Sequence, residues 1–107
     1  MVQDGARLSL LDVERIDWFE SAGNYVKVHS GTKDYLVRTT MDRVAQRLAA
    51  RRTFVRVRRS ALINIAAVAT LERYAKGTYV VQLKDGTQVI SSRYYRPKLR
   101  RLLKPDA

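Results

Sequence analysis

Short runs in which apolar and polar side chains alternate recur along this chain and predict β-strands, because successive strand residues face opposite sides of a sheet. The clearest run covers residues 24–30, where Val26 and Val28 alternate with larger or polar side chains. Strands are also expected over residues 7–11, 16–20, 34–39, 54–57, 61–65, 68–74, 79–83 and 87–90. The runs 61–65 and 68–74 are apolar enough to predict burial.

Two short helices are expected among these strands. Thr39 or Thr40 can cap a helix that runs to about Arg51. Its apolar positions recur at intervals of three and four residues, which makes one stripe: Met41, Val44, Ala45 and Leu48. A second helix is expected over residues 94–103, with Pro97 in its first turn, where a missing N–H costs nothing.

The connections between the expected strands are short turns, which favour antiparallel pairing. The Asp-Gly pairs at positions 85–86 and 4–5 are hairpin signals. Only residues 1–3 precede the earlier pair, so we expect a truncated first strand there and a chain cut from a longer protein. The pattern as a whole predicts a single mainly β domain over residues 4–103, with a short tail at residues 104–107.

The composition adds a strong positive charge. Lysine and arginine number 21 against 10 acidic residues, so the formal net charge is +11 over 107 residues. Solubility alone asks for a net charge of about 2–8 in a small domain, whereas a larger excess attracts polyanions. DNA, RNA and an anionic membrane are the candidate partners, and none of the expected helices is long enough for the basic amphipathic helix that a membrane surface requires.

Several classes of protein are excluded or disfavoured. The chain has no cysteine, which excludes disulfides, thiolate metal sites and cysteine catalysis. No apolar run approaches the ~20 residues of a membrane span, and the first residues lack a signal peptide's basic and apolar segments. We therefore expect a cytoplasmic protein.

Catalytic and cofactor chemistry finds little support in the residues. His29 is the single histidine and is expected at a strand's solvent face. The serines lack a nucleophile elbow, and no glycine-rich loop could cradle a phosphate. The acidic residues Asp12, Glu14, Asp17 and Glu20 do not have the spacing of a known metal loop. We expect no enzyme activity, cofactor or metal.

Basic side chains cluster after the strand that begins at Phe54. Val55 and Val57 are expected on one side of this strand, with Arg56 and Arg58 on the other. Arg59 follows, and three arginines in four residues repel one another with no acid nearby in the strand. A bound polyanion would relieve that repulsion, and guanidinium groups suit phosphates and guanine edges.

Other polar positions allow two interpretations. Arg93 follows two serines at an expected strand-to-helix junction, where free N–H groups attract anions. It either reaches a base edge there or is a loop arginine without a contact. Asn24 either holds a left-handed turn or pairs with adenine. Arg51 and Arg52 either complement a helix C-terminus or contact phosphate. The residues alone leave these alternatives open.

Four blocks together resemble the LytTR family of DNA-binding domains. The blocks are residues 16–26 (IDWFESAGNYV), residues 54–60 (FVRVRRS) followed by Asn64, the Asp-Gly pair at 85–86, and Ser92-Arg93. They occur in the family's order and at fitting intervals, over about residues 4–103. Two departures are visible: Arg58 stands where the family usually has His, and the first strand is nearly missing.

The resemblance implies a mainly β fold, an elongated arrangement of small antiparallel sheets with one or two short helices. It also implies duplex DNA binding by loops and strand ends that enter neighbouring major grooves. Carried over position by position, the base contacts are Asn24, Arg59 and Arg93. The phosphate contacts are Lys27, Arg56, Arg58 and Ser60. Two further phosphate contacts are expected from the residues themselves: Ser92 at the strand-to-helix junction and Arg96 on the last helix. We expect Asn64, at another family position, to close a turn internally.

The resemblance also implies that this domain is the effector part of a bacterial response regulator in a two-component system. Such domains regulate transcription as homodimers on repeated half-sites, behind a phosphorylated receiver domain that these 107 residues do not include. Two alternatives remain at this point: a basic RNA-binding domain, and a protein-interaction module with an incidentally basic surface.

Overall fold

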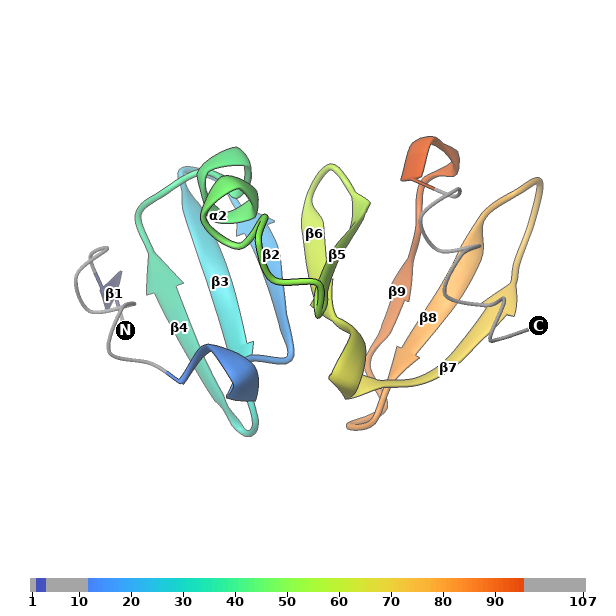
Figure 1. The fold of residues 1–107 in the computed structure, drawn as a ribbon, viewed down its shortest axis with the longest axis horizontal. Helices are drawn as coiled ribbons and strands as arrows, with labels where there is room; N and C mark the ends of the chain where they lie inside the picture. Colours follow the sequence, from blue (N-terminus) through green and yellow to red (C-terminus); the bar gives the residue numbers. More distant parts are fainter. Residues whose placement is uncertain (1, 4–11, 96–107) are drawn as a thin grey trace.

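The computed structural model describes residues 2–3 and 12–95, which form two β-sheets side by side along an axis of 40 Å (Figure 1). In chain order the elements are β1 Val2–Gln3, η1 Val13–Arg15, β2 Trp18–Ala22, β3 Tyr25–Ser30, β4 Lys33–Val37, α2 Met41–Arg47, β5 Phe54–Arg58, β6 Ala61–Asn64, η2 Ile65–Ala67, β7 Val68–Arg73, β8 Tyr79–Leu83, β9 Gln88–Ile90 and η3 Arg93–Tyr95. The strand expected at 7–11, the turn at 4–5, Pro97 and the helix beyond Tyr95 lie outside the described residues.

The mainly β, elongated fold predicted from the sequence is confirmed, with extents of 40 × 26 × 23 Å. The larger sheet has six strands in the order β1-β4-β3-β2-β6-β5. Val26 and Val28 of β3 are buried while their neighbours are only half-buried, so the predicted alternation is correct. One pairing differs from the antiparallel expectation: β1 runs parallel to β4, with Val2 opposite Leu36.

The smaller sheet has three antiparallel strands in the order β7-β8-β9. The predicted hairpin at positions 84–86 joins β8 to β9, and Gly86 has the positive φ (95°) that the turn requires. The predicted burial of residues 68–74 is wrong, because only Val68 and Leu71 of β7 turn partly inward. A register shift between Val68 and Thr70 interrupts the alternation and leaves the rest of this edge strand exposed.

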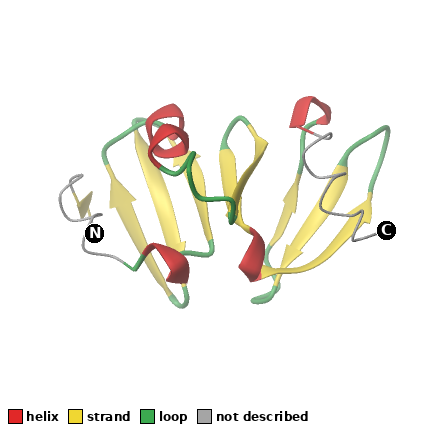
Figure 2. Ribbon diagram, in the orientation of Figure 1, coloured by secondary structure: helices red, strands yellow, loops and turns green. Residues whose placement is uncertain are grey.

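Two hydrophobic cores lie on opposite faces of the larger sheet, and strand β2 contributes to both. Figure 2 shows the strands of the two sheets, with α2 beside the larger one. Trp18 enters the core between the two sheets, where it joins Ile63 of β6 and Val81 of β8. Phe19, the next residue, enters the core beneath α2 and packs against Phe54. Because neighbouring strand residues point to opposite faces, this one strand holds the two halves of the domain together.

Helix α2 covers the second core and begins where the sequence predicts. The side-chain oxygen of Thr40 accepts a hydrogen bond from the backbone N–H of Arg43, and Met41 and Val44 are buried. The helix ends at Arg47 and not near residue 51. The chain turns there because Phe54 must enter the core, so Arg51 and Arg52 lie in an exposed connection and do not close the helix.

Asn64 closes a turn internally, as expected. It is 3% exposed. Its Nδ2 donates to the carbonyls of Glu14 and Ile16, and its Oδ1 accepts from the backbone N–H of Ala66. These bonds fasten the start of η2 to the segment that precedes β2.

The turns fall into two groups at opposite edges of the molecule (Figure 1). The β2–β3 turn, α2, the β5–β6 turn and η3 lie along one edge, which we call the loop edge. The short helices η1 and η2 and the β3–β4 and β8–β9 turns lie along the other. Within the described residues, no helix has both the length and the apolar character needed to cross a membrane.

Candidate nucleic-acid interface

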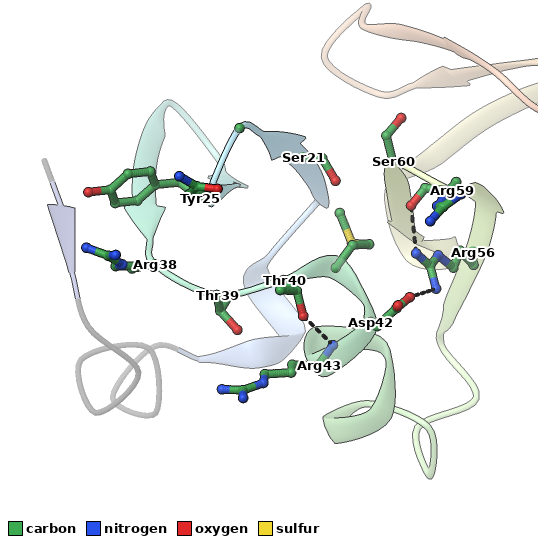
Figure 3. Close-up of a pocket in the computed structure, with 13 residues that line it drawn as sticks. Ser21, Tyr25, Arg38, Thr39, Thr40, Asp42, Arg43, Arg56, Arg59 and Ser60 are labelled. Carbon is green, nitrogen blue, oxygen red and sulfur yellow. Dashed lines mark hydrogen bonds and ion pairs between the residues drawn. The ribbon is translucent and has the colours of Figure 1, made fainter.

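A groove at the loop edge brings together segments that are far apart in the sequence (Figure 3). It is lined by the β2–β3 turn with Asn24, the connection from β4 to α2, the first turn of α2, and the β5–β6 turn with Arg59 and Ser60. Its charged lining consists of four arginines and one carboxylate: Arg38, Arg43, Arg56, Arg59 and Asp42. The groove therefore carries a clear excess of positive charge.

Asn24 lies on an exposed turn that does not depend on its side chain. Gly23, and not Asn24, takes the left-handed conformation, with φ of 66°. The left-handed-turn interpretation of Asn24 is therefore wrong. The Asn24 side chain is exposed at the groove, where its amide can meet a ligand.

A backbone hydrogen bond joins the Asn24 turn to the Arg59 turn. The N–H of Ser21 donates to the carbonyl of Ser60 at 2.9 Å, just beyond the last β2–β6 pair. Arg59 is exposed, and within the described ranges it forms no ion pair. Its guanidinium is presented to solvent from a turn whose backbone is fixed.

Arg56 and Arg58 do not share a side of β5, contrary to the expectation from alternation. A bulge between them pairs Arg56 with Leu62 and Arg58 with Ala61. Leu62 belongs to the core beneath α2 and Ala61 to the core between the sheets. One extra residue in a strand reverses the side on which later side chains fall.

The two arginines consequently have different partners. Nη1 of Arg56 lies 2.9 Å from Oδ1 of Asp42, so its acidic partner comes from α2 and not from the strand itself. Nη1 of Arg58 points instead to the carbonyl of Ile90 at the end of β9, at 3.4 Å. Asp42 was missed because an acidic residue in the first turn of a helix is already explained by the helix dipole.

The segment that carries Arg93 is attached to the free edge of β5. The backbone N–H of Ser92 donates to the carbonyl of Val57 at 2.9 Å, and the N–H of Tyr95 donates to the carbonyl of Ser92 at 3.3 Å. Arg93 itself is exposed. It does not line the groove of Asn24 and Arg59, but η3 lies at the same loop edge (Figure 1).

The remaining predicted phosphate contacts lie in different parts of the structure, and only one of those that the structure describes lines the groove. Ser60 lines the groove. Ser92 is half-buried, and its hydroxyl oxygen is buried without a hydrogen-bond partner among the described residues. Lys27 is half-buried in β3 opposite Glu20, on the sheet face away from α2, so the structure does not bring it to the groove. Arg96 lies outside the described residues.

His29 occupies a structural position and is not a bare surface residue. Its Nδ1 lies 2.8 Å from Oδ1 of Asp34, and its Nε2 lies 2.8 Å from Oε1 of Glu20. The ring stacks on Trp18, with centroids 4.5 Å apart. Strand pairing explains the arrangement, because His29 is directly opposite Trp18 on β2 and Asp34 on β4.

The early acidic residues have individual partners and do not form a cluster. Asp12 accepts the backbone N–H of Glu14 at the start of η1, and Asp17 accepts the N–H of Gly31. No group of three potential metal ligands occurs within residues 2–3 and 12–95. In the β8–β9 turn, hydrogen bonds from the backbone and side chain of Thr87 lower the pKa of Asp85 below its ordinary value.

Comparison with known proteins agrees with this architecture. A family model described as the LytTr DNA-binding domain matches residues 6–104. Sensory transduction protein LytT of Bacillus subtilis (strain 168) is 26% identical over 99 residues, which are 92% of this chain and 41% of that protein. The chain thus spans about two fifths of that relative's length. A solved LytTr DNA-binding domain from Bacillus cereus superposes with a TM-score of 0.77 at 17% identity, over 88% of this chain and 85% of that chain.

The two joined sheets and the basic loop edge agree with a mainly β DNA-binding domain. The family model covers nearly the whole chain, including the sequence blocks at residues 16–26 and 54–60. The chain belongs to the LytTR family of DNA-binding domains.

Proposed function

We propose that the loop edge binds double-stranded DNA with sequence preference, and that Asn24, Arg59 and Arg93 contact base edges. The observation that carries this proposal is the groove that Asn24 and Arg59 share although they come from separate turns. Arginine pairs bidentately with guanine and asparagine with adenine, both from the major groove. Arg93, on a segment bonded to β5, provides a third point along the same edge.

Phosphate neutralisation supplies most of the affinity in this proposal. Arg58, Ser60, Ser92, Lys27 and Arg96 remain its predicted phosphate contacts. The net charge of +11 supports a large electrostatic contribution. Phosphate contacts set register on the duplex but carry no sequence information, so affinity and selectivity depend on different side chains.

The biological setting follows from the family and remains part of the proposal. The domain acts as the effector of a bacterial response regulator, in which a receiver domain provides the signal. It binds repeated half-sites as a homodimer, regulates transcription in the cytoplasm, and catalyses no reaction. The similarity to a sensory transduction protein supports this setting.

A salt titration with a competitor tests the proposal. Fluorescence anisotropy on a labelled duplex is expected to show affinity falling steeply with salt, with a slope that corresponds to about 6–10 neutralised phosphates. Structured RNA of equal length serves as competitor at one salt concentration. Affinity that does not depend on salt, or displacement of the duplex by RNA at equal concentration, would contradict duplex DNA binding.

RNA is the second candidate ligand, and one exposed aromatic side chain favours it. Tyr94 is 82% exposed and follows Arg93 directly. Exposed aromatics stack on unpaired bases in single-stranded complexes. Replacement Tyr94→Ala separates the two candidates: it leaves duplex binding almost unchanged if DNA is the ligand, and it removes most of the RNA affinity if a single strand is.

A further inference from the structure

We propose that Arg56 and Asp42 are a positioning pair for the base-contacting turn, and that Arg56 is not itself a phosphate contact. The inference rests on the proposed function, because the turn it positions carries Arg59. It changes the role of a residue whose charge and neighbours in the sequence suggest contact with the DNA backbone.

Arg56 already has partners within the protein. Nη1 lies 2.9 Å from Oδ1 of Asp42, and Nη2 donates to the carbonyl of Arg59 at 2.7 Å (Figure 3). The guanidinium carbon lies 6.0 Å from the centre of the Tyr95 ring, within range of a cation–π contact. One side chain therefore contacts α2, the β5–β6 turn and η3.

Burial separates Arg56 from Arg59, the arginine proposed to contact a base. Only 16% of its side chain is exposed. Nε is buried and has no partner among the described residues, so it is not presented to a ligand. Both terminal nitrogens already donate inside the protein, one to the Asp42 carboxylate and one to the Arg59 carbonyl, so a phosphate would have to share them with these partners. Arg59, by contrast, is exposed and free of ion pairs within the described part of the chain.

The carbonyl that Arg56 holds belongs to the very residue proposed to contact a base. The next carbonyl in the chain, that of Ser60, accepts the N–H of Ser21. Two consecutive peptide groups of the turn are thus fixed from opposite sides, one by β2 and one by Arg56. A side chain that must reach a base edge gains affinity when its backbone is already in the bound geometry, because less conformational entropy is lost on binding.

Asp42 has two opposing effects on DNA affinity: its charge repels the DNA, and its ion pair positions Arg56. It is the single carboxylate lining the groove, and its side chain is 78% exposed. An exposed carboxylate beside a polyanion weakens binding through repulsion. The ion pair with Arg56 offsets this cost by holding the guanidinium toward the Arg59 carbonyl. The two roles predict opposite signs when Asp42 is replaced.

The experiment compares Asp42→Ala with Glu72→Ala, an exposed carboxylate on β7, by anisotropy on a duplex site selected with the unchanged protein. Glu72→Ala is expected to raise affinity slightly for all duplexes, because it removes a negative charge. Asp42→Ala is expected to lower affinity for the selected site by about tenfold, the loss expected from one charged hydrogen bond. Random duplex, which needs no fixed turn, is expected to bind Asp42→Ala as well as it binds Glu72→Ala.

The salt dependence of Arg56→Gln provides the second measurement. If Arg56 positions the turn, cognate affinity falls while the slope of log affinity against log salt stays the same. If Arg56 contacts a phosphate, the slope falls by about 0.9, and the proposal is overturned. Equal or increased cognate affinity in Asp42→Ala overturns it as well, and this variant remains decisive if Arg56→Gln does not fold.

A structural measurement distinguishes failure of this inference from failure of the DNA-binding proposal. Amide hydrogen exchange at Ser21, whose N–H donates to the Ser60 carbonyl of this turn, is expected to accelerate in Asp42→Ala in the free protein and to stay unchanged in Glu72→Ala. If exchange accelerates in Asp42→Ala but the unchanged protein selects no duplex sequence, the positioning pair is retained and sequence-specific DNA binding is rejected. Unchanged exchange in both variants would reject the positioning pair even if DNA binding is specific.

Discussion

The backbone carbonyl of Ser60 accepts a hydrogen bond from the N–H of Ser21 at 2.9 Å, and this bond holds two turns together across the sheet. One turn carries Asn24 and the other carries Arg59, separated by more than thirty residues in the chain. Because β2 and β6 are neighbours in the larger sheet, their ends meet at the loop edge. The sheet therefore places two base-contacting candidates from separate turns in one groove.

Replacing Arg59 or Arg93 by alanine is expected to reduce affinity for a selected duplex by about 1–3 kcal/mol each, because a bidentate guanine contact is lost. Random duplex should bind almost as before. The matched control is Arg15→Ala, which removes one exposed charge at the opposite edge. Equal losses on selected and random duplex would show that Arg59 and Arg93 contact phosphates only.

The two asparagines should give opposite phenotypes. Asn64→Ala removes one buried and two partly buried hydrogen bonds to the backbone, so the free energy of unfolding is expected to fall by about 2–4 kcal/mol. Asn24→Ala changes an exposed side chain and should alter the unfolding free energy by less than about 0.5 kcal/mol. Denaturant unfolding measures both values.

In DNA binding the order of the two asparagine variants is reversed. Asn24→Ala is expected to weaken binding to the selected duplex, while folded Asn64→Ala binds it normally. If Asn64→Ala changed sequence preference without loss of stability, the internal role of Asn64 would be wrong.

The conformation of Gly23 is expected to control the Asn24 turn. A Cβ at Gly23 would meet nothing within 4 Å, so the cost of Gly23→Ala comes from its φ of 66° and should be about 1–2 kcal/mol. Gly31, in the turn at the opposite edge, has φ of 63° and equally open surroundings. Gly31→Ala should therefore cost the same stability but leave DNA affinity unchanged, whereas Gly23→Ala should reduce both. Equal effects on DNA would count against the Asn24 turn.

Acid sensitivity should arise in part from the β8–β9 turn. The Thr87 hydrogen bonds lower the pKa of Asp85 in the folded protein, so this carboxylate stabilises the fold at pH values above its unfolded pKa of about 4. That stabilisation is lost as the pH falls through the lower folded value. Because Asp85 is exposed, the effect should be small.

Denaturant unfolding of Asp85→Asn alongside the unchanged protein checks this. The stability difference between the two should be constant above about pH 5 and should shrink below about pH 4. A difference that grows on acidification would mean that the carboxylate is not held in its ionised form by the turn.

Much of the fold could be predicted from local signals. Alternation located β3, the Thr40 cap and apolar stripe located α2, and the Asp-Gly pair located the β8–β9 hairpin. Each of these signals is local, because it depends on neighbouring residues alone. The end of α2, the exposure of β7 and the parallel pairing of β1 depend on which elements pack together, and no local pattern records that.

The site was predictable to the level of residue type but not of side-chain role. The resemblance pointed to Asn24 and Arg59, and the structure places both in one groove. The bulge in β5 could not be anticipated, since its residues alternate normally in sequence. It sends Arg58 away from Arg56, and it leaves Arg56 beside an acid that is fourteen positions earlier in the chain.

The most direct test of the central claim is selection of bound sequences from a random duplex pool, with the unchanged protein and with Arg59→Ala and Arg93→Ala in parallel. We predict one enriched sequence with the unchanged protein, and loss of preference at a different base position in each variant. A pool without enrichment, or the same enriched sequence from all three proteins, would contradict base reading by the loop edge.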